Sequence, residues 1–346
     1  MHKIIEYEQL INNEIKGTYQ LIDVRSPSEH KAETIPGSIN LPLLDDEERT
    51  RVGTVYVNES ADKAKKLGIE IVSKKLPDLY SKIIDLSNQY DNLIFFCYRG
   101  GLRSKVLVSL LDSLGIRAFK LNGGYKRYRK YVIKALPEIV KKVNFVVIHG
   151  NTGTGKTQIL KILNQKSMDV LDLEGCANHR GSFFGSIGLG KQNTQKMFES
   201  LIYESLSKSK SSIVFVEGES RRIGRNIIPK CIFQKMWEGT HIKVESDLDI
   251  RVNNIINDYV NANNEELIKS LNFLKSTLGI KNIERYADMI RKFEYEDVVR
   301  ELMIKYYDPL YKRENIDFAA TFNSNNPEEA ACQIIKWSKD NLKGWH

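Results

Sequence analysis

Residues 144–157 read Asn144-Phe145-Val146-Val147-Ile148-His149-Gly150-Asn151-Thr152-Gly153-Thr154-Gly155-Lys156-Thr157. The first six form a short apolar run typical of a buried strand, and apolar residues at helical spacing follow the last one. The eight residues from Gly150 to Thr157 fit the phosphate-loop pattern Gly-x-x-x-x-Gly-Lys-[Ser/Thr]. In such a loop, backbone N–H groups close on a phosphate, the lysine adds a charge, and the threonine hydroxyl can reach a magnesium ion. The stretch predicts an α/β domain that binds phosphate through these eight residues.

Two further apolar runs follow this loop, at residues 170–173 and 212–216, and each comes after a helical stretch. Strands that alternate with helices predict a parallel sheet. From about Asp247 onward the sequence is mostly charged and helical in pattern, notably at 263–278 and 283–307. The second half of the chain is therefore expected to be a parallel-sheet domain with a helical C-terminal region.

The first part of the chain shows the same alternation. Apolar runs at 19–24, 93–96 and 118–121 are separated by helical stretches such as 62–71 and 79–89, so a second parallel sheet is expected. A length of 346 residues suits two domains, because a typical domain holds roughly 100 to 200 residues. The predicted domains are residues 1–135 and 141–346.

Composition limits the class of protein. The net charge of +8 favours an anionic partner without identifying it, and many soluble proteins are mildly basic with no such partner. The N-terminus has early acidic residues and no apolar leader, and the apolar runs are too short for a membrane helix, so a cytoplasmic protein is expected. The four cysteines lie far apart without metal-ligand spacing, which predicts neither a disulfide framework nor a metal site.

A second candidate site surrounds Cys97. Here a buried strand runs into a turn with two glycines and then into a helix, which places backbone N–H groups and a helix N-terminus around the sulfur. Nearby cations lower the pKa of a thiol, so a nucleophilic thiolate is expected. The alternative is a small buried hydrophobe that ends a strand. The predicted catalytic residues are Cys97, Arg99, Gly100, Gly101 and Arg103.

Polar residues after the other strands are candidates for binding the substrate. The strand at 213–217 ends in glutamate rather than the usual aspartate, so ATP hydrolysis does not follow from it. Its carboxylates could hold magnesium, orient a diphosphate, or form a solvated strand end, and these three readings stay open. Residues 172–188 are dense in glycine, polar and aromatic residues, which is typical of a ligand-binding loop, although a plain surface loop is the alternative. The candidate diphosphate residues are Glu174, His179, Arg180, Ser182, Glu217, Glu219, Arg221 and Arg222.

The first domain resembles the rhodanese family. The resemblance rests on Leu21 to His30, on Ile35 to Pro42 and on the cysteine loop, in that order. It implies that Cys97 carries a sulfur or selenium atom and passes it on. Many single-domain rhodaneses read C-x-x-G-x-R-S, whereas Arg103 here lies six residues after Cys97, as in the similar C-x5-R loop of dual-specificity phosphatases. A phosphatase-like enzyme is therefore an alternative, although no general acid for it is identified.

The order of the two domains resembles one family closely, the bacterial tRNA 2-selenouridine synthases. Two positions depart from that family, since Cys176 and Tyr306 stand where leucine and histidine are commoner, and a role of that histidine does not carry over to Tyr306. The resemblance covers nearly the whole chain and includes Cys97 to Ser104, Gly123 to Lys126, the phosphate loop, Leu173-Glu174-Gly175, Asn178 to Ser182, Gly185 to Gly188, Gln192, Gln195, Phe198-Glu199, Glu217 to Ser220, Ile223-Gly224 and Tyr307 to Tyr311.

This resemblance implies an α/β fold, with an N-terminal rhodanese-like parallel-sheet domain followed by a P-loop NTPase-like α/β domain with a helical C-terminal extension. It also implies a transferase that acts on the wobble 2-thiouridine of tRNA. Geranyl diphosphate first alkylates the thiocarbonyl sulfur, and selenium from selenophosphate then replaces the geranylthio group. On this reading the phosphate loop, Lys156 and Arg180 hold the diphosphate, and Cys97 handles selenium.

The expected partners are tRNA, geranyl diphosphate and selenophosphate, with no tightly bound cofactor and with magnesium compatible with the loop. For tRNA the candidate residues are Tyr125, Lys126, Arg127 and Arg129, together with the basic helices expected after residue 280. Tyr125 or Tyr128 would be available to stack on a flipped base. The alternatives are a rhodanese-type sulfurtransferase coupled to a P-loop NTPase, the C-x5-R phosphatase-like enzyme, and a noncatalytic RNA-binding module.

Overall fold

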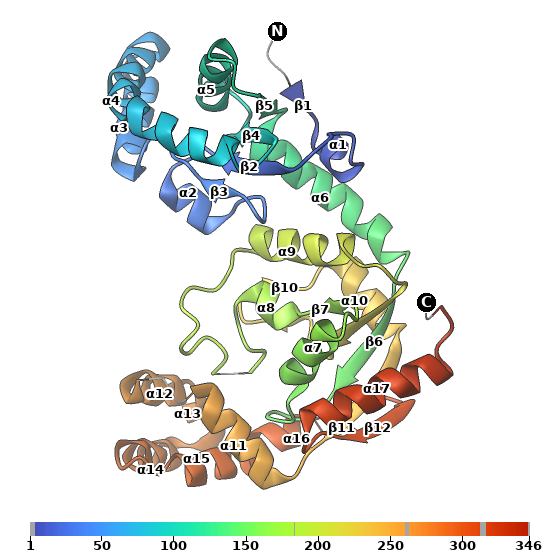
Figure 1. Cartoon of the computed structure of the whole chain (residues 1–346). Helices are drawn as coiled ribbons and strands as arrows, with labels where there is room; N and C mark the ends of the chain where they lie inside the picture. Colours follow the sequence, from blue (N-terminus) through green and yellow to red (C-terminus); the bar gives the residue numbers. More distant parts are fainter. Residues whose placement is uncertain (1–3, 183, 260–262, 312–315, 345–346) are drawn as a thin grey trace. The chain divides into compact units, whose positions relative to one another are not determined.

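The computed structural model describes residues 4–182, 184–259, 263–311 and 316–344. The chain divides into two compact units, Met1–Lys134 and Ala135–His346, coloured from blue to green and from green to red in Figure 1. The division falls inside helix α6 (Gly124–Val140). No helix within the described ranges combines the length and the apolar character that a membrane span requires.

The first unit is built on a five-stranded sheet in which all paired strands are parallel, in the order β1-β5-β4-β2-β3. The central strand β4 is buried at all five positions, as expected for a strand covered by helices on both faces. The strands are β1 (Ile4–Ile5), β2 (Tyr19–Asp23), β3 (Ile39–Asn40), β4 (Asn92–Phe96) and β5 (Ala118–Leu121). The helices before α6 are α1 (Tyr7–Ile11), α2 (Pro27–Ala32), α3 (Asp46–Asn58), α4 (Ala61–Ser87) and α5 (Leu102–Ser113).

Helix α4 corrects one expectation for this unit. The two helical stretches expected at 62–71 and 79–89 form one helix of 27 residues, with Pro77 in its interior. A proline removes one backbone hydrogen bond and disfavours a helix interior. Leu79 and Ile83 lie beyond Pro77 and pack into the same apolar core as β2 and β4, so burial keeps the helix continuous.

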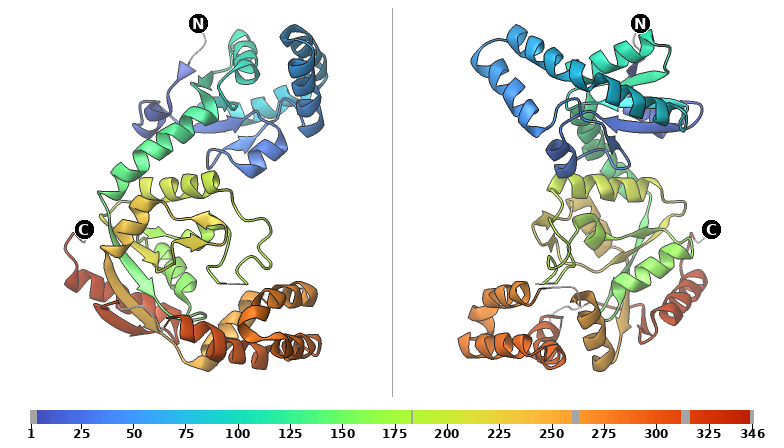
Figure 2. Two further views of the ribbon diagram at one scale, coloured as in Figure 1. Left: turned by 180° about the vertical axis from the view of Figure 1, so that it is seen from behind. Right: turned by 60° about the vertical axis from the view of Figure 1, so that its left-hand side comes forward.

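The second unit also contains a five-stranded parallel sheet, in the order β12-β11-β6-β8-β7. Helices α7 and α17 lie side by side against one face of this sheet and share its apolar core (Figures 1 and 2). The strands of the sheet are β6 (Asn144–His149), β7 (Val170–Leu171), β8 (Ile213–Glu217), β11 (Thr240–Glu245) and β12 (Ala320–Asn323). The helices around it are α7 (Lys156–Gln165), α8 (Leu173–Ala177), α9 (Gln195–Ser207), α10 (Lys230–Trp237) and α17 (Pro327–Asn341).

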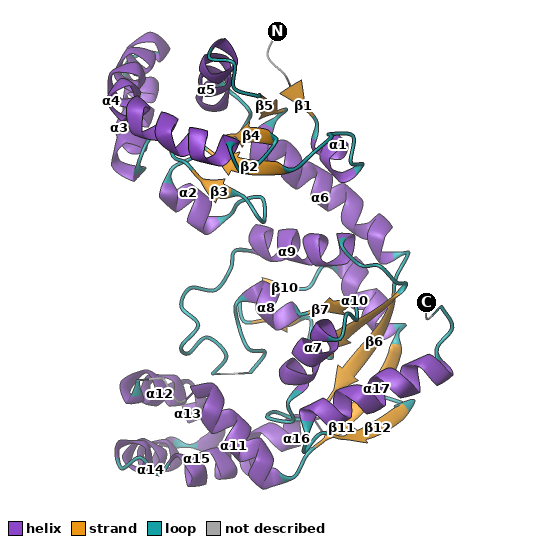
Figure 3. Ribbon diagram, viewed as in Figure 1, coloured by secondary structure: helices purple, strands orange, loops and turns teal. Residues whose placement is uncertain are grey.

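A separate antiparallel ribbon joins β9 (Arg222–Ile223) to β10 (Asn226–Ile227). Between β11 and β12 the chain forms a group of helices, coloured purple in Figure 3, with its own apolar core. These elements are α11 (Leu248–Tyr259), α12 (Asn264–Leu271), the short helix η1 (Asn272–Leu274), α13 (Lys275–Leu278), α14 (Ile280–Arg291), α15 (Tyr295–Leu302), the π-helix η2 (Met303–Tyr307) and α16 (Asp308–Tyr311).

The helical C-terminal region is interrupted after α16. Strand β12 returns to the sheet and pairs in parallel with β11, with Ile242 opposite Ala320. This strand has only four residues, Ala-Thr-Phe-Asn, so its sequence carries too few apolar positions to predict a strand. Hydrogen bonding to β11 and the packing of Phe322 into the core define it instead.

Candidate functional site

Cys97 lies directly after β4, at the point where the strand enters the glycine turn. Its side chain is buried, and its Sγ accepts a hydrogen bond from the N–H of Gly101 (3.2 Å) and lies 3.4 Å from Oγ of Ser104. Helix α5 begins at Leu102, directly after Gly101, so its positive end points toward the sulfur. The N–H groups of residues 98–100 donate to no other described residue. The turn is thus a set of unengaged donors around a thiol, which suits an anion.

The start of α6 holds this turn in place. Tyr125 N–H donates to the carbonyl of Cys97 (3.0 Å), and Lys126 N–H donates to the carbonyl of Tyr98 (2.8 Å). Gly124 has φ +56°, and a Cβ at that position would lie 2.0 Å from the carbonyl oxygen of Cys97. Only glycine allows this close approach of the two backbones. The helix that leads into the second unit therefore begins on the cysteine turn.

The two arginines expected beside the thiol differ in their surroundings. Arg99 is exposed. Arg103 donates to Oε2 of Glu29 at 2.8 Å. Burial opposes ionisation of Glu29, but the hydrogen bond and charge of Arg103 outweigh it and hold the pKa of Glu29 below its usual value. Arg103 is therefore engaged with a carboxylate on α2 in this state of the protein.

The residues expected to bind tRNA on α6 require a correction. Tyr125 and Tyr128 are each 1% exposed, and Arg129 is 6% exposed. Tyr125 packs under the guanidinium of Arg25 at 4.4 Å, within a buried aromatic group at the base of α6. Neither tyrosine can stack on a base without unfolding this core, because α6 turns its aromatic stripe inward. Lys126 and Arg127 are exposed, and Arg127 pairs with Glu6 (2.9 Å).

The phosphate loop occupies the turn between β6 and α7, and three side chains from later in the chain hold its backbone. Nε of Arg251 donates to the carbonyl of Thr152 (2.9 Å), Nδ2 of Asn254 donates to that of Gly153 (2.8 Å), and Oγ of Ser324 donates to that of Thr154 (2.9 Å). Within the loop, the N–H of Thr154 donates to the carbonyl of Asn151 (3.2 Å). These contacts fix the backbone that a phosphate would meet.

Arg251 is itself fixed by Asp308. Its guanidinium makes two hydrogen bonds to that carboxylate, at 2.6 and 3.1 Å, and Nδ2 of Asn151 donates to the same group (3.0 Å). Sequence reasoning missed Arg251, Asn254 and Ser324 as site residues. Asp308 lies in the stretch Tyr307 to Tyr311, which carries part of the family resemblance but had no predicted role.

Lys156 and Thr157 open helix α7 and both point to the loop region. Nζ of Lys156 donates to the carbonyl of Gly150 (2.6 Å), so the ammonium lies over its own loop. Oγ1 of Thr157 donates to Oε2 of Glu174 (2.9 Å), and the N–H of Gly181 donates to the other oxygen of that carboxylate. Glu174 thus links the phosphate loop to the glycine-rich loop that follows α8.

Glu217 ends β8 beside these groups. It is 2% exposed, and its Oε1 accepts the N–H of Glu174 (2.7 Å). Its Oε2 has no hydrogen-bond partner among the residues that the structure describes. Burial, reinforced by the charges of Asp172 and Glu174, raises the pKa of Glu217 well above its usual value. Of the three readings left open from sequence, a solvated strand end does not fit this buried carboxyl.

The loop after α8 brings His179, Arg180 and Ser182 to the same region. His179 is buried, and burial lowers its pKa, with a further lowering by the charge of Arg225. Arg180 lies over the ring of Tyr259 at 5.0 Å and donates to the carbonyl of Ile187 (2.8 Å). Oγ of Ser182 lies 3.2 Å from the hydroxyl of Tyr259. These contacts connect the loop to α11.

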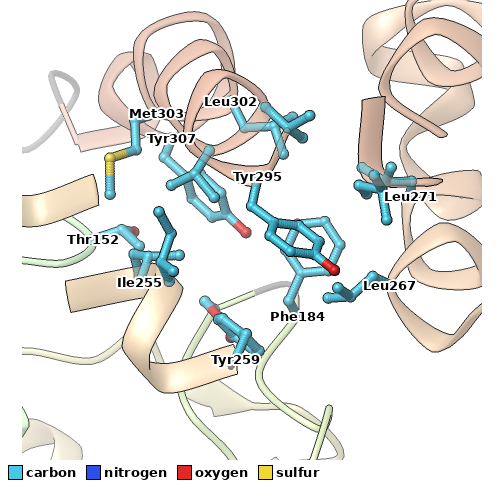
Figure 4. A pocket seen from close by; sticks show the side chains of 15 residues that line it. Thr152, Phe184, Ile255, Tyr259, Leu267, Leu271, Tyr295, Leu302, Met303 and Tyr307 are labelled. Carbon is cyan, nitrogen blue, oxygen red and sulfur yellow. The ribbon is translucent and has the colours of Figure 1, made fainter. Parts of the chain in front are cut away.

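An apolar pocket of about 130 Å³ adjoins the phosphate loop. Thr152 of the loop and Ser182 form its polar end, and side chains from α11, α12, α14, α15 and η2 form the rest. Figure 4 shows Phe184, Tyr259, Tyr295 and Tyr307 turned toward one space. Tyr306, where the resembled family more often has histidine, packs against the helical core and does not line this pocket. No local motif predicts this pocket, because its lining is spread over residues 152–307.

The remaining candidates lie at the outer side of β8. Glu219 is half-buried beside Gly181, where a Cβ would lie 2.1 Å from its carboxylate. Arg221 and Arg222 are exposed on the β9–β10 ribbon. A metal is a natural companion of a diphosphate, but the described residues contain no group of three or more His, Cys, Asp or Glu side chains placed to hold one. The nearest oxygen donors are those of Thr157 and Glu174.

Both halves of the chain match known protein families. Residues 143–292 match the family described as the tRNA 2-selenouridine synthase AAA domain, and residues 6–131 match the rhodanese-like domain. A tRNA 2-selenouridine synthase from Pseudomonas syringae pv. syringae is 32% identical, and the match covers 91% of this chain and 94% of the relative. One from Nitrosomonas eutropha is 38% identical, over 70% of this chain and 63% of the relative's own length.

A solved structure also matches part of the chain. It is titled as the N-terminal domain of a putative ATP/GTP binding protein from Clostridium difficile 630. It is 37% identical in sequence, with a TM-score of 0.36, and the match covers 38% of this chain and 99% of that one.

Proposed function

Because the chain belongs to the tRNA 2-selenouridine synthase family, we propose that it is a cytoplasmic transferase that acts on the wobble 2-thiouridine of tRNA. In the first step the thiocarbonyl sulfur attacks C1 of geranyl diphosphate. The carbon–oxygen bond breaks, and diphosphate leaves with the bonding electrons. In the second step the selenium of selenophosphate attacks C2 of the base, and the geranylthio group leaves as the thiol. Water then cleaves the selenium–phosphorus bond, which releases phosphate and leaves selenium on the base.

The observation that carries this proposal is the apolar pocket at the phosphate loop. Its volume of about 130 Å³ is close to the roughly 150 Å³ of a dry apolar cavity that binds benzene, so it suits an apolar group such as part of an isoprenoid tail. A nucleotide would instead need polar partners for its base and sugar, and this lining is mainly aromatic and aliphatic. A ligand with its diphosphate on the loop and its isoprenoid tail in the pocket satisfies both surfaces.

The groups around the loop suit the charge that develops in the first step. Negative charge grows on the diphosphate as the bond breaks, and the loop N–H groups, Lys156 and Arg180 would stabilise it. Positive charge grows on the allylic carbon, and the ring faces of Tyr259 and Phe184 would stabilise that charge by cation–π attraction. A magnesium ion, if bound, would take oxygens from Thr157 and Glu174 together with the diphosphate and add positive charge there.

Selenium delivery is assigned to the Cys97 turn. The turn offers unengaged N–H donors and a helix N-terminus, which favour a tetrahedral anion such as selenophosphate. Such an anion would lie with its selenium near Sγ. Alkylation in the first step prepares the base, because a geranylthio group leaves more easily than a neutral thiocarbonyl sulfur.

Filling the pocket tests the proposal. Val299 lines it, and Val299→Phe should weaken geranyl diphosphate binding at least tenfold, about 1.4 kcal/mol, while inorganic diphosphate binds as before. Equilibrium binding of both ligands gives the two affinities. Ile304→Phe introduces the same phenyl ring on the exposed side of η2, where the side chain is 53% exposed, and should leave both affinities unchanged.

Two results would contradict the proposal. Equal geranyl diphosphate affinity in Val299→Phe and in the unaltered protein would mean that the tail lies elsewhere. Tight ATP binding with turnover, and no geranylated nucleoside by mass spectrometry of thiolated tRNA, would favour a sulfurtransferase coupled to an NTPase.

A further inference from the structure

The β9–β10 ribbon is held rigidly by two glutamine side chains. Nε2 of Gln192 donates to the carbonyl of Ile223 (2.8 Å), and its Oε1 accepts the N–H of Arg225 (3.0 Å). Gln195 exchanges two hydrogen bonds with the backbone of Ile227, at 2.8 and 2.9 Å. Both strands are therefore fixed to the start of α9, so side chains on the outer face of the ribbon have a defined position.

The inner face of the ribbon is buried and its polar groups are hydrogen-bonded, whereas its exposed residues include positively charged arginines. Ile223 and Asn226 are opposite each other, and both are buried. Arg222 and Ile227 form the outward cross-strand pair, and both are exposed. Arg225 occupies the two-residue hairpin loop after Gly224, whose φ is +54°, as such loops favour. Three arginines, with Arg221 just before β9, are thus displayed on one small rigid element.

These three arginines differ from most others in the second unit. No described residue makes an ion pair or hydrogen bond with the guanidinium groups of Arg221, Arg222 and Arg225. In the helical region, by contrast, Arg285 pairs with Glu301, and Arg291 pairs with Asp288. Exposed arginines that lack internal partners remain available for an anion outside the protein.

The arrangement of these three arginines suits a polyanion better than a single small diphosphate. A small diphosphate is usually held by arginines that converge in a recess, where paired N–H groups meet its oxygens. Here the side chains lie on an outward face, at a hairpin tip and before a strand, so each can meet a different phosphate. Successive phosphates along a nucleic-acid backbone present that pattern.

The ribbon also lies against the candidate site. A Cβ at Gly224 would lie 2.7 Å from Cδ2 of His179, so the hairpin packs on the residue that precedes Arg180. Glu217, Gly218 and Glu219 connect β8 to the ribbon on its other side. A strand of RNA on the outer face would therefore pass the rim of the phosphate-loop site, within reach of a base turned inward.

We propose that the three exposed arginines on and beside the β9–β10 ribbon, Arg221, Arg222 and Arg225, bind the RNA backbone next to the modified uridine. This inference rests on the proposed function and replaces the α6 residues expected from sequence. It also gives Gln192 and Gln195 a role, since they hold the backbone from which the arginines project.

The test compares two variants that lose three positive charges each. R221Q/R222Q/R225Q should bind thiolated tRNA at least tenfold more weakly at low salt. Its slope of log affinity against log salt should fall by roughly 2, because about 0.7 counterion is released for each phosphate contact with a single strand. K281Q/R291Q/K292Q removes the same charge from the exposed side of α14 and its end, and should keep both the affinity and the slope.

Geranyl diphosphate binding separates this inference from the proposed function. The ribbon variant should bind geranyl diphosphate as the unaltered protein does, and a loss there would mean that Arg221 and Arg222 hold the diphosphate instead. If both triple variants lose tRNA affinity equally, the loss reflects only the change in net charge, and the inference is overturned. If the slope of log tRNA affinity against log salt falls only in K126Q/R127Q, the RNA binds to α6 instead. Failure of the unaltered protein to bind geranyl diphosphate would refute the proposed function, whichever surface binds RNA.

Discussion

Asp308 shows how one residue organises a loop more than 150 positions away. Its carboxylate binds the guanidinium of Arg251 and the amide of Asn151, while Arg251 holds a carbonyl of the phosphate loop. The Arg251 side chain is 7% exposed and that of Asp308 is 24% exposed, so the pair is largely removed from water. Removing one charge leaves the other buried without full compensation.

Asp308→Asn should therefore destabilise the second unit by about 2 kcal/mol, below the range for a fully buried pair because Asp308 is partly exposed. Urea unfolding followed by tryptophan fluorescence measures this, since all three tryptophans lie after residue 134. Asp288→Asn, which breaks an exposed pair with Arg291, is the control and should change stability by less than about 0.5 kcal/mol. If both variants lower the free energy of unfolding equally, Asp308 contributes no more to stability than an exposed residue does.

His149 gives the second unit a dependence on pH. It ends β6 and lies 2.9 Å from His241, measured from Nε2 to Nδ1. Burial, then the charges of His241 and Lys156, lower the pKa of His149 from its usual 6.5 to about 4. Since the folded state resists protonation, the unfolded state binds more protons between these two values, and stability falls as pH falls from 6.5 to about 4.

His149→Asn should flatten this part of the stability profile by about 2 kcal/mol, after allowance for partial exposure of the ring. Tryptophan-monitored unfolding at a series of pH values gives the measurement. His30 lies half-buried in the first unit, so His30→Asn should leave the profile of the second unit unchanged. An unaltered slope in His149→Asn would contradict the assignment.

At the scale of elements, the junction between the cysteine turn and α6 depends on a backbone approach. Helix α6 begins with two hydrogen bonds to the carbonyls of Cys97 and Tyr98, and Gly124 makes that approach possible. A methyl group at Gly124 would collide with the carbonyl of Cys97 and push the turn away from the helix. A displacement of about 1 Å at a reacting group can lower a rate roughly a hundredfold.

Gly124→Ala should therefore slow selenium incorporation by about a hundredfold and leave geranylation at its normal rate. Mass spectrometry of wobble nucleosides follows both products. Gly115→Ala is the matched control, because Gly115 also has a positive φ of +77° but no atom lies within 4 Å of its added Cβ. If both variants lose selenium incorporation equally, backbone strain rather than the collision at Cys97 explains the loss.

At the scale of the whole molecule, the two chemical steps are assigned to different units. The phosphate loop and the apolar pocket belong entirely to the second unit, and the Cys97 turn belongs to the first. Each unit has its own parallel sheet and apolar core. The two steps should therefore be lost separately.

Cys97→Ser should stop selenium incorporation and let geranylated tRNA accumulate, whereas Lys156→Ala should stop geranylation itself. Both products are measured by mass spectrometry after incubation with thiolated tRNA, geranyl diphosphate and selenophosphate. Lys161→Ala, on the exposed side of α7, should leave both steps intact. Loss of both steps in Cys97→Ser would refute the assignment of the steps to separate units.

Sequence alone determined the features that depend on local order. A strand, a glycine loop and a helix must be adjacent to bind a phosphate, so residues 144–157 predicted that loop directly. The cysteine turn after β4 could also be predicted, because the strand, the glycines and the helix around Cys97 are adjacent in sequence. The α/β fold with two parallel sheets follows from the alternation of strands and helices. The family was recognisable because its motifs occur in order along the chain.

Tertiary structure decided the features that depend on which face is buried or on distant residues. The basic aromatic stretch at the start of α6 looked like an RNA surface, but its aromatic stripe packs into the core, because charge and aromaticity alone do not say which way a helix faces. The apolar pocket and the Arg251–Asp308 pair join positions that are far apart in sequence. The phosphate loop of residues 150–157 could thus be read from its local pattern, whereas the pocket beside it exists only once the helices after β11 fold over Thr152.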